Sequence, residues 1–305
     1  MSDRIAQQGV PPLKGLGRGE PEERAKLIFF WDYDTQWGAD RSRTPGGKKN
    51  WGHLEFENTD PLLELLARYD IPSCFAVVGS AALPGRRPYH DPEQIRRIRS
   101  AGHEIASHAH RHEWLPGLGP GQLRETLTES KDALEQCVGE SVVSFVPPFN
   151  QPFDHHAGFS FSISERREAG RERTDLARLC AALVETGYRF CRVAYRPMHV
   201  RIYERLVRRR FDRPSHIEMI SGIHCVKVNT PGGFGLRTTQ LIENHLHEGG
   251  IWILHAHPHS LNNLDTPQTG VALERFLKRS AEWRREGRVR CVQPRNLLDG
   301  AYRVG

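Results

Sequence analysis

Residues 102–112 read GHEIASHAHRH, a short strand-like run that ends in closely spaced histidines. His108 and His112 are four positions apart. On a turn that follows a strand, side chains at this spacing lie on one side and can reach a common ion. An isolated HxxxH pattern is more often a surface turn rich in histidine. The pattern therefore gains meaning only from what lies at the ends of the neighbouring strands.

The first apolar run, residues 27–34, reads LIFFWDYD and places two carboxylates at the end of an aromatic strand. Asp32 and Asp34 obey the period of two, so both side chains can point to the same face. Two carboxylates there are costly to bury unless they are paired or bind a metal. A zinc site with open positions takes about three protein ligands, commonly two histidines and a carboxylate. His108, His112 and one of the two aspartates would supply that set.

Outward from these motifs, strand-like and helix-like segments alternate along the whole chain. Strands are expected at residues 27–34, 73–79, 104–108, 141–146, 188–193, 224–228, 250–255 and 288–292. Helices are expected at residues 60–69, 91–101, 121–137, 174–186 and 271–285. This alternation predicts an α/β fold with a parallel sheet, and seven or eight such units fit a (β/α) barrel better than an open sheet.

Polar residues follow several of these expected strands at the same end. Besides the aspartates and histidines, Pro147–Asn150 ends the fourth strand, and His255 and His257 follow the seventh. Catalytic groups in parallel barrels come from the carboxyl ends of several strands. The sequence therefore predicts one active site at that end of the barrel.

The chain of 305 residues is expected to form a single domain over residues 26–300, preceded by a flexible arm at residues 1–25. Long loops are expected at about residues 150–173 and 194–222, because both stretches break the alternation. The glycine-rich stretch at residues 232–235 lacks the residues of a phosphate-binding loop and is assigned to a turn.

Composition and charge exclude several classes of protein. Lys and Arg number 43 against 37 Asp and Glu, and this excess of +6 is dispersed and interleaved with glutamates, which disfavours a nucleic-acid partner. No run approaches the roughly 20 apolar residues of a membrane span. The first residues lack the apolar core of a secretory signal, and the six cysteines show no disulfide-dense spacing. We therefore expect a cytoplasmic protein; the sequence does not determine its oligomeric state.

Several stretches together resemble the polysaccharide deacetylases of the NodB-homology group, carbohydrate esterase family 4. The matching pieces read WDYD at residues 31–34, SCFAVVG at 73–79, GHEIASHAHRH at 102–112, FVPPFN at 145–150 and WILH at 252–255. They occur in the family's order over about residues 26–298. The first motif places the chain nearer to the branch of the family that reads D-x-D.

This resemblance implies a distorted (β/α)7 barrel and metal-dependent removal of an acyl group from the nitrogen of an N-acetylated sugar. By position, Asp34, His108 and His112 would bind a divalent metal, most plausibly zinc. Asp32 would be the general base. His255 would be the general acid, although His257, followed by proline, is the alternative.

The resemblance also implies substrate contacts and shows departures. Trp37 in the first loop and Pro148, Phe149 and Asn150 after the fourth strand are candidates for binding the sugar. Val146 stands where the family has an arginine that orients the base, so Arg192 or Arg196 is expected to replace it. Because no secretory signal is found, a small or carrier-linked N-acyl sugar is the expected substrate.

Three alternatives remain open at this stage. The same site could remove a formyl group or hydrolyse a cyclic imide or ureide. Two histidines and one carboxylate also describe an iron(II) oxygenase, although the additional Asp32 argues against it. A relative that binds a sugar or nucleotide without catalysis is the third alternative.

Overall fold

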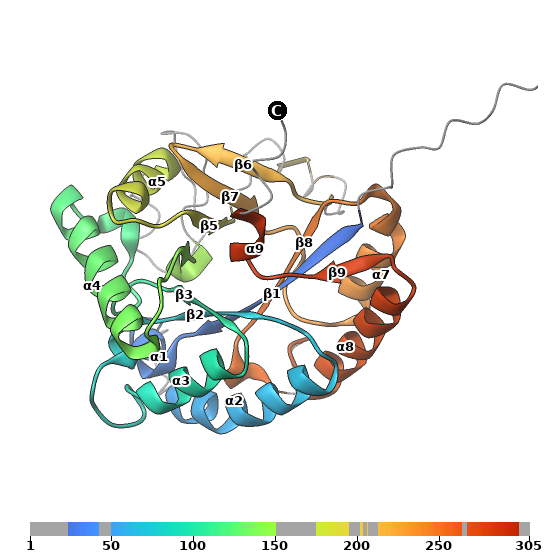
Figure 1. Cartoon of the computed structure of the whole chain (residues 1–305), viewed down its shortest axis with the longest axis horizontal. Coiled ribbons are helices and arrows are strands. Elements are labelled where there is room, and N and C mark those ends of the chain that lie inside the picture. The colour runs from blue at the N-terminus through green and yellow to red at the C-terminus, as the bar shows by residue number, and fades with distance from the viewer. Residues whose placement is uncertain are drawn as a thin grey trace, which may run out of the picture.

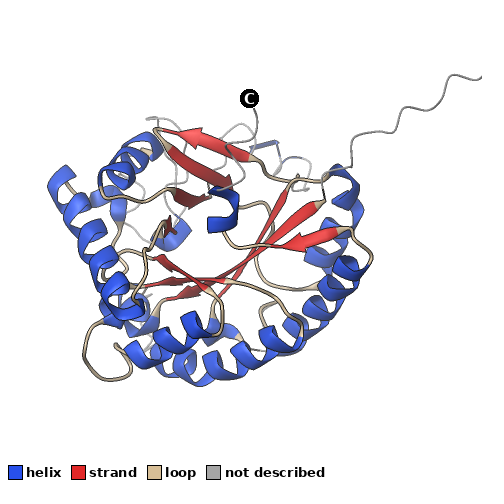
Figure 2. Cartoon of the chain, in the orientation of Figure 1, coloured by secondary structure: helices blue, strands red, loops and turns tan. Residues whose placement is uncertain are grey.

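The computed structural model describes residues 24–42, 50–150, 175–194, 202–203, 206, 213–263 and 267–298. Its strands form one curled sheet in the order β6-β7-β5-β4-β3-β2-β1-β8, with β9 paired to β1 (Figures 1 and 2). Every pairing is parallel except that of β6 with β7. The strands are β1 (Ala25–Tyr33), β2 (Cys74–Val77), β3 (Glu104–Ser107), β4 (Ser144–Phe145), β5 (Phe190–Val193), β6 (Ile217–Ile220), β7 (Ile223–Lys227), β8 (Ile251–Ala256) and β9 (Val289–Cys291).

The helices of the described part of the chain are α1 (Thr35–Arg41), α2 (Trp51–Arg68), α3 (Pro92–Ser100), α4 (Pro120–Val138), α5 (Leu176–Glu185), α7 (Leu236–His245), α8 (Gly270–Arg285) and α9 (Arg295–Leu298). Most of them lie on the outer side of the sheet (Figure 2). Short 3₁₀ turns follow β4 (η3, Pro148–Asn150) and β8 (η5, Pro258–Ser260). None of the helices in the described part of the chain combines the length and the apolar character needed to cross a bilayer.

The alternation of side chains along β1 separates two cores. Phe29 and Trp31 belong to the large cluster between the sheet and its helices. Ile28 and Phe30 belong to a smaller cluster inside the curled sheet. Because the strand repeats every two residues, Asp32 continues the inward row beyond Phe30. The inner face therefore changes from apolar to charged at the carboxyl end of the strand.

Side chains bridge the gap between β7 and β8. Asn229 Oδ1 accepts from Ile253 N at 3.0 Å, and Asn229 Nδ2 donates to Ile251 O at 2.9 Å. The side chain thus makes the hydrogen bonds that a neighbouring strand would make. Thr230 Oγ1 donates to Ile253 O at 2.7 Å. Ser215 adds an isolated antiparallel bridge to Ile251. These bonds satisfy an edge that would otherwise expose unpaired backbone groups.

Helix α9 covers the amino-terminal end of the barrel, near the centre of Figure 1. Leu297 and Leu298 join the inner apolar cluster. The helix begins at Arg295, whose backbone N donates to the buried carboxylate of Glu104 at 2.9 Å. The carboxylate thus accepts from a backbone N–H in the first turn of the helix, where N–H groups have no acceptor within the helix.

The structure confirms the expected single-domain α/β fold of the distorted (β/α)7 type, but it corrects several element boundaries. Helix α2 begins at Trp51, not at residue 60, and continues through Pro61 because Glu55, Phe56 and Thr59 are buried. Trp37 lies in α1 rather than in a loop. The assignment of residues 232–235 to a turn is confirmed; this turn leads into α7, which the sequence did not predict.

Two of the expected loops and the arm lie wholly or partly outside the described residues. Residues 1–23 and 151–174 are not described. The expected loop at residues 194–222 is described in part, and its last residues form β6 rather than irregular structure. The expected arm also ends earlier than residue 25, because β1 begins at Ala25.

Candidate metal centre

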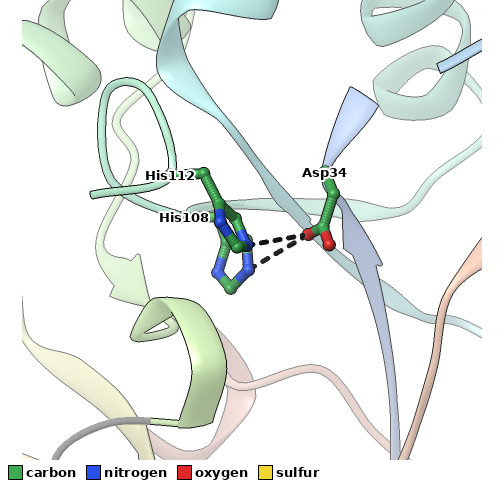
Figure 3. Close-up of side chains that lie close together, drawn as sticks. All are labelled: Asp34, His108 and His112. Carbon is green, nitrogen blue, oxygen red and sulfur yellow. Dashed lines mark ion pairs between the residues drawn. The ribbon is translucent and has the colours of Figure 1, made fainter. Parts of the chain in front are cut away.

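Three buried side chains from two strand ends converge on one point, as Figure 3 shows. Asp34 follows β1, and His108 and His112 lie in the turn after β3. Asp34 Oδ1 is 3.2 Å from His108 Nε2 and 3.5 Å from His112 Nε2. Ligand atoms about 2.0–2.1 Å from a tetrahedral zinc ion lie about 3.3 Å apart. The spacing of the three atoms therefore suits one small divalent cation.

The backbone around the histidines is bent into an unusual shape. Ala109 has φ 63° and His112 has φ 57°, both in the left-handed region. Gly79 N and Ser130 Oγ each donate to Ala109 O at 2.9 Å, which holds the turn against α4 and the end of β2. Neighbouring elements thus hold a conformation that the turn would not adopt alone, as is common at functional sites.

The orientation of the His108 ring is fixed by a second contact. Its Nδ1 lies 2.7 Å from Val146 O, a carbonyl that can only accept, so Nδ1 carries the proton. Nε2 is then the ring nitrogen that faces Asp34 and that would bind a cation. Metal-binding histidines are typically oriented in this way by a backbone carbonyl.

The polar atoms of the cluster are not satisfied by the protein itself. Among the described residues, neither Asp34 Oδ1 nor His112 Nδ1 has a hydrogen-bond partner, although both atoms are buried. Burial lowers the pKa of His112 below its usual value, and the charge of Asp34 only partly offsets this effect. A neutral imidazole and a carboxylate in need of a cation are the donor set that zinc takes, so these residues fit the metal expected from the sequence.

Asp32 is held by Arg192, a residue of β5, and three strands of the sheet lie between β5 and β1. Arg192 Nη1 donates to Asp32 Oδ1 at 2.7 Å, and Nη2 donates to Asp32 Oδ2 at 2.6 Å. Nη2 also donates to Asn150 Oδ1 at 3.1 Å. The Arg192 side chain is 1% exposed. Of the two arginines expected to replace the one missing at Val146, Arg192 pairs with Asp32, and Arg196 lies outside the described residues.

This pair keeps Asp32 ionised. Burial by itself would raise the pKa of the carboxyl, but the charge of Arg192, with smaller contributions from His108 and the hydrogen bonds, lowers the pKa of Asp32 well below its usual value. The bidentate geometry also fixes the plane of the carboxylate. Asp32 therefore lies beside the metal cluster as an oriented anion.

His255 and His257 both lie on the inner side of β8 and its extension, but in different surroundings. In the sheet, His255 is paired with Phe30, an inward residue. A Cβ at Gly232 would lie 3.3 Å from His255 Nε2, so the turn at residues 232–233 packs against that ring. His257 Nε2 lies 3.8 Å from Asp34 Oδ2, and its side chain is 29% exposed.

The residues expected to bind substrate are only partly beside the cluster. Phe149 packs its ring against His112 at 4.4 Å and Trp114 at 5.7 Å. Asn150 contacts Arg192, as described above, and Pro148 is buried next to them. Trp37 packs on Tyr89 at 5.1 Å, so its contact with a sugar stays a prediction.

Sequence reasoning missed a second set of buried groups behind the cluster. Glu55 of α2 is fully buried and accepts a hydrogen bond from Thr35 N, directly after Asp34. His259 Nδ1 lies 3.5 Å from Glu55 Oε1, and the His259 ring is stacked on Trp51. No sequence pattern indicates this set, because a single glutamate on a helix is usually exposed to solvent, and its burial is evident only in the folded structure.

Comparison with protein families identifies residues 52–157 as a match to the family described as polysaccharide deacetylase. Among curated proteins, the chain is 28% identical over 88 residues to a chitooligosaccharide deacetylase of Sinorhizobium fredii, covering 29% of this chain and 38% of that protein. It is 26% identical over 98 residues to the Bacillus subtilis protein YlxY, which is uncharacterized, covering 32% of this chain and 28% of that protein. The matched regions thus span about a third of these relatives.

Solved structures share the fold over nearly the whole chain. A structure titled probable polysaccharide deacetylase, from Pseudomonas aeruginosa PAO1, matches with a TM-score of 0.59 at 16% identity, covering 94% of this chain and 96% of that one. A structure titled Puue allantoinase matches with a TM-score of 0.57 at 15% identity, covering 95% and 97%. The comparisons agree with the resemblance to the polysaccharide deacetylases drawn from the sequence.

Proposed function

From this relationship to the polysaccharide deacetylases, we propose that the chain hydrolyses the amide of an N-acylated sugar, most plausibly an N-acetylated one. The observation that carries the proposal is the buried Asp34–His108–His112 cluster with the arginine-held Asp32 beside it. Asp34, His108 and His112 would hold the cation. A divalent metal such as zinc supplies acidification of a water molecule and polarisation of the amide carbonyl when it is bound there.

The residues of this chain then divide the proton transfers between them. Asp32 accepts a proton from the attacking water as the water oxygen bonds to the carbonyl carbon. Arg192 keeps Asp32 ionised and aims its carboxylate, so that the base is ready at neutral pH. The low pKa of Asp32 makes it a weak base. It is effective only because it is already oriented.

An acid completes the reaction. The carbon–nitrogen bond breaks as a histidine at the end of β8, His255 or His257, gives a proton to the departing nitrogen. The products are a carboxylate and a free amine, so one water is consumed for each amide. A small or carrier-linked N-acyl sugar is the proposed substrate class.

The test combines metal content with two assays on wild type and Asp32→Asn: amine release from a panel of N-acetyl and N-formyl sugars, and ring opening of a cyclic ureide, which releases no amine. We expect about one zinc per chain in both proteins and amine release only in wild type, with acetate as the second product. Amine release from the formyl sugar alone, or ring opening of the ureide alone, would move the assignment to those amides. Absence of metal binding, with no effect of His108→Ala, would refute the hydrolase and favour a binding protein.

A further inference from the structure

One face of α2 is packed against the segment that carries His257. Trp51, Glu55 and Asn58 follow one another at helical spacing, and all three contact the turn η5 after β8. Asn58 Nδ2 donates to Pro258 O at 2.9 Å. The ring of Trp51 stacks on His259 at 4.4 Å with an angle of 7° between the planes. The segment is therefore held at two successive residues by a helix from the other end of the chain.

Glu55 links this face to the metal cluster. One of its carboxylate oxygens accepts from Thr35 N, next to Asp34, and the other lies 3.5 Å from His259 Nδ1. The carboxylate is fully buried, and burying such a group is costly unless it is paired. A single side chain thus holds the backbone beside a proposed metal ligand and lies next to the ring of His259, two residues after His257.

His259 in turn contacts His257. Their ring centroids are 4.9 Å apart with an angle of 42° between the planes. The Nε2 atom of His257 faces Asp34 Oδ2, and part of its side chain is exposed to an incoming substrate. His255 is half-buried as well, and the turn at Gly232 lies close to its Nε2. His257 is the histidine that both faces Asp34 and adjoins the buried contacts between α2 and η5.

We propose that Trp51, Glu55 and His259 form a positioning unit that holds His257, rather than His255, where it protonates the departing amine; this inference rests on the proposed amide hydrolysis. The proton passes from His257 to the nitrogen as the carbon–nitrogen bond breaks, and no other reactant is needed. Displacement of a catalytic group by about 1 Å can lower the rate by about 10²-fold, so residues that hold His257 in place can affect the rate strongly.

The test compares an amide with an activated ester, because a nitrophenolate leaves without being protonated. We expect His257→Asn to lower kcat by about 10²–10³-fold for the N-acyl sugar of the panel above that wild type hydrolyses. Hydrolysis of 4-nitrophenyl acetate should change little. His259→Phe keeps the stacking on Trp51 but removes the nitrogen that faces Glu55. It should lower kcat for the amide by about 10-fold, leaving KM, zinc content and the ester rate unchanged.

The controls lie on the same helix. Glu57→Gln and His53→Phe alter exposed residues of α2 and should change neither rate. The double variant His257→Asn/His259→Phe should be no slower than His257→Asn alone, because the unit acts only through His257. In the metal-free protein, the ring resonances of His257 should shift in His259→Phe and Glu55→Gln but not in Glu57→Gln.

Two outcomes would overturn the inference while leaving the proposed function intact. One is a selective loss of amide hydrolysis in His255→Asn; the other is an equal loss of amide and ester hydrolysis in His259→Phe. If wild type with zinc bound hydrolyses none of the sugars of that panel, the proposed function fails, and the inference fails with it.

Discussion

Both ends of the barrel interior bury carboxylates, but the carboxylates at the two ends differ in their hydrogen-bond partners. At the amino-terminal end, Glu104 accepts from Ser144 Oγ at 2.6 Å and from Arg295 N at 2.9 Å. The guanidinium of Arg295 adds an ion pair at 3.7 Å. At the carboxyl-terminal end, Asp34 Oδ1 faces only two histidines and has no hydrogen bond among the described residues. The carboxylate of Glu104 thus has hydrogen-bond partners on both oxygens, whereas Asp34 has a buried oxygen with none among the described residues.

This difference separates a structural end from a functional one. Groups that stabilise a fold find their partners within it, whereas a site that binds a ligand leaves polar atoms for the ligand to satisfy. The residues with left-handed backbone in the turn after β3 also lie at the carboxyl-terminal end. Variants at the two ends should therefore affect different properties.

The largest effect is expected at Asp34. Asp34→Asn removes the negative ligand, so zinc content should fall and amide hydrolysis should drop by about 10³-fold or more, because the metal contributes several kcal/mol to the reaction. The midpoint of thermal unfolding of the metal-free protein should change little. Elemental analysis, amine release and calorimetry measure the three quantities, and unchanged zinc content would refute the ligand assignment.

The next effect is expected at Arg192, whose guanidinium forms a buried ion pair with Asp32. Arg192→Met leaves Asp32 buried without its cation and should lower the free energy of unfolding by about 3–5 kcal/mol. The double variant Arg192→Met/Asp32→Leu should recover most of that stability but none of the activity. Urea unfolding and amine release test this, and a single variant as stable as wild type would contradict it.

At the amino-terminal end, His103 makes stability depend on pH. Burial lowers the pKa of His103 from 6.5 to about 4, and its Nδ1 accepts from Ser73 N at 3.2 Å. The unfolded chain therefore binds a proton at a pH where the folded protein does not. Stability is complete above about pH 6.5 and should fall by up to about 3 kcal/mol as the pH drops toward 4.

His103→Gln keeps an acceptor for Ser73 N and should flatten this part of the profile. The exposed His247→Gln is the matched control and should leave the slope as in wild type. Urea unfolding at a series of pH values measures the difference, and parallel profiles of His103→Gln and wild type would refute the role of His103.

The smallest effect is expected for Glu104→Gln. The amide oxygen can still accept from Arg295 N, and the amide nitrogen can donate to Ser144, so only the charge is lost. We expect a loss of about 1 kcal/mol in the free energy of unfolding, with zinc content and amine release unchanged. Impaired metal binding in this variant would show that the two ends are coupled and would contradict their separate roles.

The elements that the sequence predicted well are those whose signals are local. Helix α3 was predicted from its Asp-Pro start, and Asp91 indeed caps it by accepting from Gln94 N. The same Asp-Pro signal at residues 60–61 wrongly predicted the start of a helix there, because burial of the preceding turns extends α2 through Pro61. Helix α7 was missed because its few buried residues give a weak apolar pattern.

The sequence by itself determined the order of strands and helices, the shared face of Asp32 and Asp34, and the spacing of His108 and His112. Each of these depends on neighbours within a few residues. Only the tertiary structure decided that Arg192 holds Asp32 across 160 positions and that Glu55 lies beside His259. Such partners are chosen by the curvature and register of the sheet, which bring distant strand ends together and leave no periodic trace in the chain.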